Sequence, residues 1–228
     1  AKFDYEMDER VAILTMNSGE NRFNFSFFKN FLEILDKIER DTDADGRIDE
    51  RDLLANGKTM TRHSLDVHGE IVGILTFDGE QRPLEWRRDT TGDGRMDTVY
   101  QYEVGKPRLV TRDTTGDGRV NVWQRFRNEK PCEQKADLNG DGQVDQTIRF
   151  DEQGRSVESH HDLDEDGRLE TIRYYKNGEL CRQEGFMSGR KEPDAVTEFT
   201  GGQAVSEQRD TNGDGAFDVR GRPGGLQR

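Results

Sequence analysis

The chain has 228 residues, of which 30% are hydrophobic and 36% are charged, and its formal net charge is −13 at neutral pH. An acidic chain of this kind lacks the basic face that phosphate contacts require, so nucleic acid is not an expected partner. The apolar content is too low to fill a thick two-layer core and favours an elongated array, in which each unit buries a thin strip against its neighbours. There is no run of 18 apolar residues, so no membrane span is expected.

Residues 1–40 differ from the rest of the chain. The segments KFDYEM and VAILTM predict two short strands, and Asn24 or Ser26 is a candidate N-cap for a helix that runs to about Arg40. The apolar residues of this helix form one broad face that must pack on something. We therefore expect residues 1–40 to be a β-β-α cap on the first unit of the array, because terminal repeats need caps.

Residues 11–45 resemble the start of an enoyl-CoA hydratase/isomerase (crotonase) domain. The resemblance rests on the strand VAILTMN, the Asn-Arg-Phe-Asn segment at 21–24 and the long first helix, and it stops near Asp45. The oxyanion-hole segments and acid/base carboxylates of that family do not follow. The resemblance implies a chimera, and it leaves a CoA-thioester enzyme fragment or an inactive relative as an alternative function.

From residue 41 onward an aspartate-rich loop recurs. The six copies begin at residues 41, 89, 113, 137, 162 and 210, in steps of 48, 24, 24, 25 and 48 residues. The two double steps predict degenerate copies at 65 and 186, where LDVHGEIVG and FMSGRKEPD have lost most acidic residues. A fixed period of 20–50 residues is typical of stacked repeats. The units therefore start at 41, 65, 89, 113, 137, 162, 186 and 210.

Each unit has the pattern loop, strand, turn, strand. An aromatic residue follows the first loop residue by 13 positions, and a Gly-rich turn comes next, as in YYKNGEL at 174–180. The pattern predicts a mainly β fold, an array of about eight 24-residue β-hairpins in an elongated twisted antiparallel sheet. A solenoid and a small propeller are the alternatives. The predicted domains are the cap at 1–40, the repeats at 41–219 and a flexible tail at 220–228.

The loops follow the pattern D-x-[DN]-x-D-G-x-x-[DEN], which offers side-chain oxygens at positions 1, 3, 5 and 9. Calcium takes six to eight oxygen ligands in flexible geometry, and the glycine at position 6 allows a sharp reversal. We expect the apolar residue at position 8 to anchor the loop to the core. Up to six calcium ions are predicted, with these candidate ligands: Asp41, Asp43, Asp45, Asp49, Asp89, Thr91, Asp93, Asp97, Asp113, Thr115, Asp117, Asn121, Asp137, Asn139, Asp141, Asp145, Asp162, Asp164, Asp166, Glu170, Asp210, Asn212, Asp214 and Asp218. The loops with threonine at position 3 are expected to be the weaker sites.

The loops resemble EF-hand loops over their first nine residues and, more closely, the calcium loops of FG-GAP and thrombospondin type 3 repeats. An EF-hand needs a bidentate Glu at position 12, and only Asp52 offers a carboxylate there, so helix-pair EF-hands are not expected. Loops of this kind bind calcium at roughly 10⁻⁴ to 10⁻³ M. That range favours an extracellular, periplasmic or cell-surface location, with a leader absent or removed; the crotonase-like segment would instead favour the cytoplasm.

No catalytic constellation is recognisable, so the chain is predicted not to be an enzyme. Adjacent His160 and His161 are expected to face opposite sides of a strand as solvated residues. Cys132 and Cys181 fall in one column of the repeat, two units apart, and are expected to be small buried residues rather than a disulfide. The predicted function is a calcium-binding structural or interaction module with a protein or cell-surface partner. A calcium-independent peptide-binding repeat with exposed aromatics is an alternative.

Overall fold

The computed structural model describes residues 2–8, 11–17, 37–222 and 225–227. The chain divides into two compact units, Ala1–Arg82 and Pro83–Arg228. Within the described residues every helix-or-strand element is a β-strand. The predicted all-β class is therefore confirmed, whereas the predicted domain boundaries at 40/41 and 219/220 stay predictions.

The first unit contains two antiparallel sheets. Strand β1 (Lys2–Asp8) pairs with β2 (Val11–Asn17), which confirms the two strands predicted near the N-terminus. The second sheet is a meander of β3 (Lys37–Arg40), β4 (Glu50–Ala55), β5 (Lys58–Leu65) and β6 (Ile71–Phe77).

The predicted helix from residue 24 or 26 to about Arg40 is wrong at its C-terminal end. Residues 37–40 form β3, in which Glu39 pairs with Arg51 and Arg40 with Glu50. The cross-strand charge pairs explain this, because opposite charges placed directly opposite each other stabilise a ladder. The remainder of the predicted helix lies at residues 18–36, outside the described residues.

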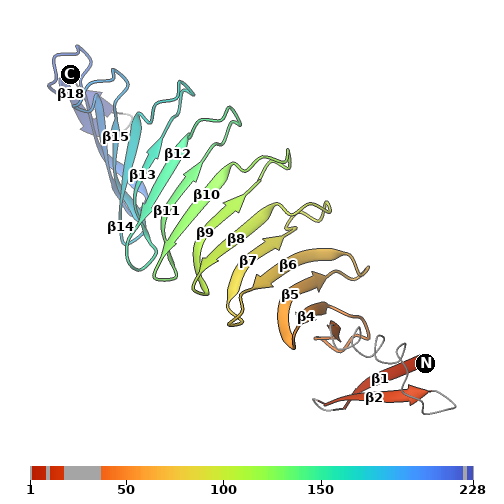
Figure 1. Ribbon diagram of the computed structural model, residues 1–228. Coiled ribbons are helices and arrows are strands. Elements are labelled where there is room, and N and C mark those ends of the chain that lie inside the picture. Colours follow the sequence, from red (N-terminus) through yellow and green to blue (C-terminus); the bar gives the residue numbers. More distant parts are fainter. Residues whose placement is uncertain (1, 9–10, 18–36, 223–224, 228) are drawn as a thin grey trace. The chain divides into compact units, whose positions relative to one another are not determined.

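The second unit is a single open antiparallel meander in which each strand pairs with the next one along the chain (Figure 1). The strands are β7 (Pro83–Arg88), β8 (Thr98–Glu103), β9 (Lys106–Arg112), β10 (Val122–Arg127), β11 (Lys130–Ala136), β12 (Gln146–Phe150), β13 (Ser156–His161), β14 (Thr171–Lys176), β15 (Glu179–Gly185), β16 (Ala195–Thr200), β17 (Gln203–Arg209), β18 (Val219–Arg222) and β19 (Gly225–Gln227). The predicted array of hairpins is confirmed, as a sheet rather than a solenoid or a propeller.

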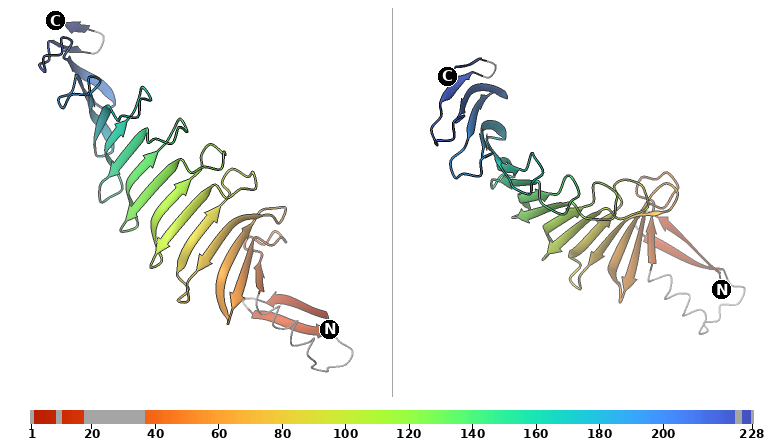
Figure 2. Two further views of the ribbon diagram at one scale, coloured as in Figure 1. Left: turned by 45° about the horizontal axis from the view of Figure 1, so that its top comes forward. Right: turned by 90° about the horizontal axis from the view of Figure 1, so that it is seen from above.

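In the second unit the tight turns lie at one end of the strands and the aspartate-rich loops at the other end (Figure 2). Most of the tight turns have two central residues, both with positive φ, as at Asn177 (φ 53°) and Gly178 (φ 84°). Two such residues are the signature of the type I′ turn, whose twist matches that of the flanking strands. These turns are therefore closed by local backbone geometry, whereas in the longer turn at 151–155 the carboxylate of Asp151 accepts hydrogen bonds from Gln153 and Arg155.

The hairpins have a β-bulge directly before the position of the recurring aromatic residue, 13 positions after the start of the loop. In the β8–β9 pair, Gln101 faces Leu109 and Tyr102 faces Pro107, so Arg108 has no partner across the ladder. The unpaired residue in each hairpin is, in chain order, Met60, Arg108, Cys132, Val157, Cys181 or Val205. The two cysteines are free and half-exposed at this position, so the expectation that they are buried was wrong.

The most deeply buried residues of the second unit lie near the loops. Val110, Val122 and Ala136 are 0%, 8% and 2% exposed, and several loop carboxylates are buried beside such residues. The apolar residue at loop position 8 does not join this strip, since Val120 is 41% exposed and its equivalents are half-buried. The prediction that this residue anchors the loop is therefore wrong for Val120 and stays a prediction for the other loops.

Candidate metal centre

The loop at 162–170 shows how the sequence pattern folds. The carboxylate of Asp162 accepts hydrogen bonds from the backbone N–H groups of Glu165 (2.7 Å) and Gly167 (2.8 Å). Asp166 in turn accepts from the N–H of Arg168 at 2.9 Å. Short acidic side chains favour such bonds to nearby backbone groups, which is why Asp recurs at alternate positions. The loop is thus coiled around its own carboxylates.

Position 9 closes the loop. The Oε1 atom of Glu170 accepts from the backbone N–H of Leu163 at position 2, over 2.7 Å. In four loops position 2 is a threonine, whose hydroxyl bonds the same ninth side chain, and these are Thr42, Thr90, Thr114 and Thr211. These threonines were not among the predicted site residues. Their signal was the recurrence of threonine directly after the first aspartate.

Four carboxylates converge in this loop. Ligand atoms of Asp162, Asp164, Asp166 and Glu170 all lie within 4.8 Å of one another. Glu170 is only 7% exposed, and its Oε2 atom is buried without a hydrogen-bond partner. Leaving a buried charged oxygen unpaired is costly, so such an atom calls for an explanation such as an ion. The four side chains supply only hard oxygen donors, so the cluster could hold a hard metal cation.

The cluster is open to solvent on one side. Asp164, Asp166 and Glu170 line a shallow hollow between this loop and the following one, whose Met187 and Arg190 form the other wall. An ion therefore has a path of entry, which a metal site requires.

A second cluster lies in the first unit. Ligand atoms of Asp41, Asp43 and Asp49 come within 4.8 Å of one another, whereas Asp45 is not part of the group. Asp49 accepts hydrogen bonds from the N–H and the hydroxyl of Thr42, each at 2.7 Å. The first two aspartates are exposed, so this cluster is less enclosed than the one around Glu170.

In the other four loops of the described chain, the acidic side chains do not converge to this degree. The loop at 137–145 shares one feature with the first cluster, because Asp145 is 5% exposed and its Oδ1 atom is buried without a partner. In the loop at 89–97, by contrast, both oxygens of Asp97 are satisfied by Thr90, Thr91 and Thr98.

Hydrogen bonds lower the pKa of several ninth-position carboxyls. The hydroxyl and N–H of Thr42 lower the pKa of Asp49 from its usual value of 3.8. The N–H and hydroxyl of Thr211 likewise lower the pKa of Asp218. At Asp97 burial is the largest influence and acts to raise the pKa, but bonds from Thr90 and Thr98 outweigh it and the net direction is down.

Asp52, the one EF-hand-like carboxylate at position 12, is already paired. It is 0% exposed on β4, 2.7 Å from Nη2 of Arg40 and 2.8 Å from Nε of Arg62. Two guanidinium groups therefore pair with this carboxylate in place of a metal ion.

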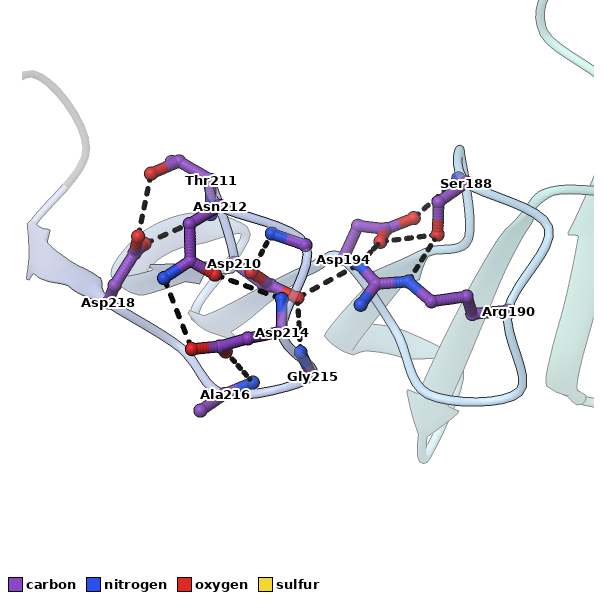
Figure 3. Close-up of polar contacts among 11 residues, drawn as sticks. Ser188, Arg190, Asp194, Asp210, Thr211, Asn212, Asp214, Gly215, Ala216 and Asp218 are labelled. Carbon is purple, nitrogen blue, oxygen red and sulfur yellow. Dashed lines mark hydrogen bonds and ion pairs between the residues drawn. The ribbon is translucent and has the colours of Figure 1, made fainter.

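The two degenerate loops are held without an acidic cluster. At 66–70 the Oδ1 atom of Asp66 accepts from the N–H groups of His68 and Glu70, each at 2.9 Å, and closes a short turn. At 186–194 the side chain of Arg190 bonds the carboxylate of Asp194 and also reaches Asp210 in the next loop (Figure 3).

The adjacent histidines do face opposite sides of β13, but only His160 resembles the expectation. His161 is 8% exposed, and its Nε2 atom lies 2.8 Å from Oγ of Ser159. The prediction that it is solvated was wrong. Its neighbour His160 contacts Glu158 at 2.7 Å on the other face.

No family model matches the chain, and no curated protein does. Among solved structures, TarM matches with 12% identity and a TM-score of 0.27, covering 75% of this chain and 24% of TarM. A mutant of S. aureus TarM, in complex with fondaparinux, alpha-GlcNAc-glycerol and UDP, matches with 12% identity and a TM-score of 0.28, covering 77% and 25%. The chain spans about a quarter of the length of these structures, and likenesses this low carry no argument. In the ranges that the structure describes, no helix is long and apolar enough to cross a membrane.

Proposed function

We propose that this chain is a calcium-stabilised structural or interaction module. Its aspartate-rich loops bind calcium at one end of the strands of the hairpin sheet. The observation that carries the proposal is the buried, unpartnered Oε2 atom of Glu170 beside the carboxylates of Asp162, Asp164 and Asp166. A cation bonded to that oxygen would remove the cost of burying it unpaired.

The donor set favours calcium over other metals. Both clusters offer carboxylates only, and soft or borderline metals such as zinc prefer Cys and His ligands. Magnesium demands near-ideal octahedral geometry and keeps several waters, whereas calcium accepts the irregular arrangement of a coiled loop. Backbone carbonyls and water would complete its shell.

The proposed role is mechanical rather than catalytic. Calcium neutralises the charge gathered in the loops, which otherwise repels itself in a chain of net charge −13. Affinities of about 10⁻⁴ to 10⁻³ M suit an extracellular, periplasmic or cell-surface setting, because such sites stay empty at resting cytosolic calcium. A protein or cell-surface partner would then bind to a sheet that calcium has ordered.

A thermal unfolding experiment tests the proposal. The chain is melted in chelator, in millimolar calcium and in millimolar magnesium. Calcium at ten times the dissociation constant contributes about 1.4 kcal/mol per site, so Tm is expected to rise clearly in calcium and less in magnesium. An unchanged Tm in millimolar calcium would overturn the proposal.

The variant Glu170→Gln sharpens the test. It is expected to reduce the calcium-induced rise in Tm, and to leave Tm in chelator equal or higher, because it removes the unpartnered charge. The matched control is Glu152→Gln, which makes the same change at an exposed residue in the turn at 151–155. The control is expected to change neither value.

A further inference from the structure

The degenerate loop at 186–194 carries a positive charge where the six acidic loops carry a negative one. Arg190 stands at position 5, which is aspartate in all six acidic loops: Asp45, Asp93, Asp117, Asp141, Asp166 and Asp214. An arginine here is a reversal of the pattern and not merely the loss of a ligand.

The guanidinium group of Arg190 lies between two carboxylates from successive loops (Figure 3). Its Nη2 atom is 2.5 Å from Oδ1 of Asp194, at position 9 of its own loop, and 2.9 Å from Oδ2 of Asp210, at position 1 of the next. Its Nε atom donates to Oγ of Ser188 at 2.8 Å, and Ser188 in turn bonds Asp194.

This arrangement is well shielded from solvent. The side chains of Arg190, Asp194 and Asp210 are 29%, 14% and 1% exposed. Hydrogen bonds to Asp194, and then to Asp210, raise the pKa of Arg190. Partly buried charge pairs are screened less by salt than surface pairs.

We propose that Arg190 is a built-in cation, which holds the 186–194 loop closed without metal and lowers the calcium affinity of the neighbouring 210–218 loop by occupying Asp210. The second half of this proposal rests on the proposed calcium-binding function. Arg190 is thus an affinity-setting residue for the last of the six loops.

The comparison with the other loops supports this reading. Among the described residues, the remaining first-position aspartates have no Lys or Arg within ion-pair distance, and they bond mainly to backbone N–H groups such as those of Gly140 and Gly142 beside Asp137. Asp210 keeps the equivalent bonds to Gly213 (2.7 Å) and Gly215 (2.9 Å) and adds the arginine. A calcium ion at this loop must therefore approach a carboxylate that already has a cation.

The test uses the full chain and the variant Arg190→Gln, with Arg119→Gln as the matched control. Arg119 is an exposed loop arginine with no ion pair among the described residues, and its replacement by Gln makes the same change in net charge. Calcium binding is titrated by calorimetry, and Tm is measured in chelator.

In chelator, Arg190→Gln is expected to lower Tm by about 2–4 °C more than the control. In the titration it is expected to increase the calcium affinity of one site at least fivefold relative to the control. This factor corresponds to the repulsion between two unit charges about 4 Å apart in water. Adding Asp210→Asn to Arg190→Gln is expected to abolish that gain.

The proposed function and the proposed role of Arg190 can be overturned independently. If the native chain binds no calcium, the proposed function fails, whereas the loss of Tm in chelator still tests the built-in cation. If calcium binds but Arg190→Gln behaves like Arg119→Gln in both measurements, the inference is overturned and the proposed function stands.

Discussion

The backbone N–H of Asp162 donates to the backbone carbonyl of Asp145 over 2.8 Å. These residues hold position 1 of one loop and position 9 of the loop before it, and both positions are candidate metal ligands. The same bond links further loops of the second unit, joining Asp113 to Asp97, Asp137 to Asn121 and Asp210 to Asp194. A backbone hydrogen bond therefore joins a candidate ligand residue of one loop directly to a candidate ligand residue of the next.

This link predicts that calcium binding in adjacent loops is coupled. Asp145→Asn and Glu170→Gln are each expected to reduce the calcium-induced stabilisation, and their effects in the double variant are expected to depart from additivity by at least about 0.5 kcal/mol. The measurement is a double-mutant cycle of unfolding free energies with and without calcium. The control cycle pairs Glu170→Gln with Asp49→Asn, in the other unit, and should be additive.

Strain at position 4 predicts a stabilising substitution. Four loops have glycine at this position, but Glu165 adopts a φ of 62° there. A non-glycine residue in the left-handed region costs about 1 kcal/mol, so Glu165→Gly is expected to stabilise the chain by roughly that amount in urea unfolding. Glu165→Gln keeps the strain and serves as the charge control.

The reverse change provides a check on the same reasoning. Gly140 has a φ of 80°, and a Cβ atom placed there meets nothing within 4 Å. Gly140→Ala is therefore expected to destabilise the chain by about 1 kcal/mol through backbone conformation alone. A neutral effect would show that position 4 tolerates side chains, and the prediction for Glu165 would fall with it.

His161 predicts a loss of stability in mild acid. Burial is the main reason that its pKa lies below the usual 6.5, with further contributions from Arg173 and His160. The unfolded chain therefore binds this proton more readily than the folded one. The stabilising contribution is complete above pH 6.5 and decreases as the pH falls from there through the folded-state pKa.

Unfolding free energies between pH 7.5 and 5, in chelator, measure this effect. The variant His161→Gln is expected to have a flatter profile below pH 6.5, because it removes the linked proton. His68→Gln, at an exposed turn residue, is the control and should follow the native profile.

The threonine at position 2 predicts a second acid-sensitive step. The hydroxyl of Thr90 donates to Oδ1 of Asp97 at 2.6 Å and helps to hold the pKa of that carboxyl below 3.8. Thr90→Val is expected to cost about 1 kcal/mol at neutral pH. The lowered pKa makes this contribution complete above pH 3.8 and lost as the pH falls further, so the difference between variant and native chain should vanish in strong acid.

Much of the fold could be predicted because the repeat encodes it locally. Asn177-Gly178 dictates a type I′ turn by its φ preferences, and Tyr175 marks the strand before it wherever the period places an aromatic. The strand at 37–40 could not be predicted in this way. The apolar spacing of the predicted helix includes Ile38 and fits a helix face. The pairing of Arg40 with Glu50 on the next strand makes residues 37–40 a strand instead.

The candidate site was predictable in its ligand types and not in its geometry. The pattern gave the same weight to Asp166 and to Asp45, yet only the first joins a converging cluster. Convergence does not follow burial, because the exposed loop at 41–49 brings three carboxylates together and the loop at 89–97, with Asp89 and Asp97 buried, does not. It depends on the folded conformation of each loop, which a single loop sequence does not record. The role of Arg190 was hidden for the same reason, since its second partner lies 20 residues away, at Asp210.

The bulge near the turn of each hairpin places two cysteines of the second unit at equivalent positions, from which the spacing of the hairpins can be measured. Cys132 and Cys181 are the unpaired residues of two bulges, in hairpins separated by one other hairpin, and both thiols are free and half-exposed. A pair of spectroscopic labels attached there would report the rise of the sheet across a whole number of repeats. No cysteine would have to be introduced, so the spacing of the hairpins could be followed in the native sequence as calcium is added or removed.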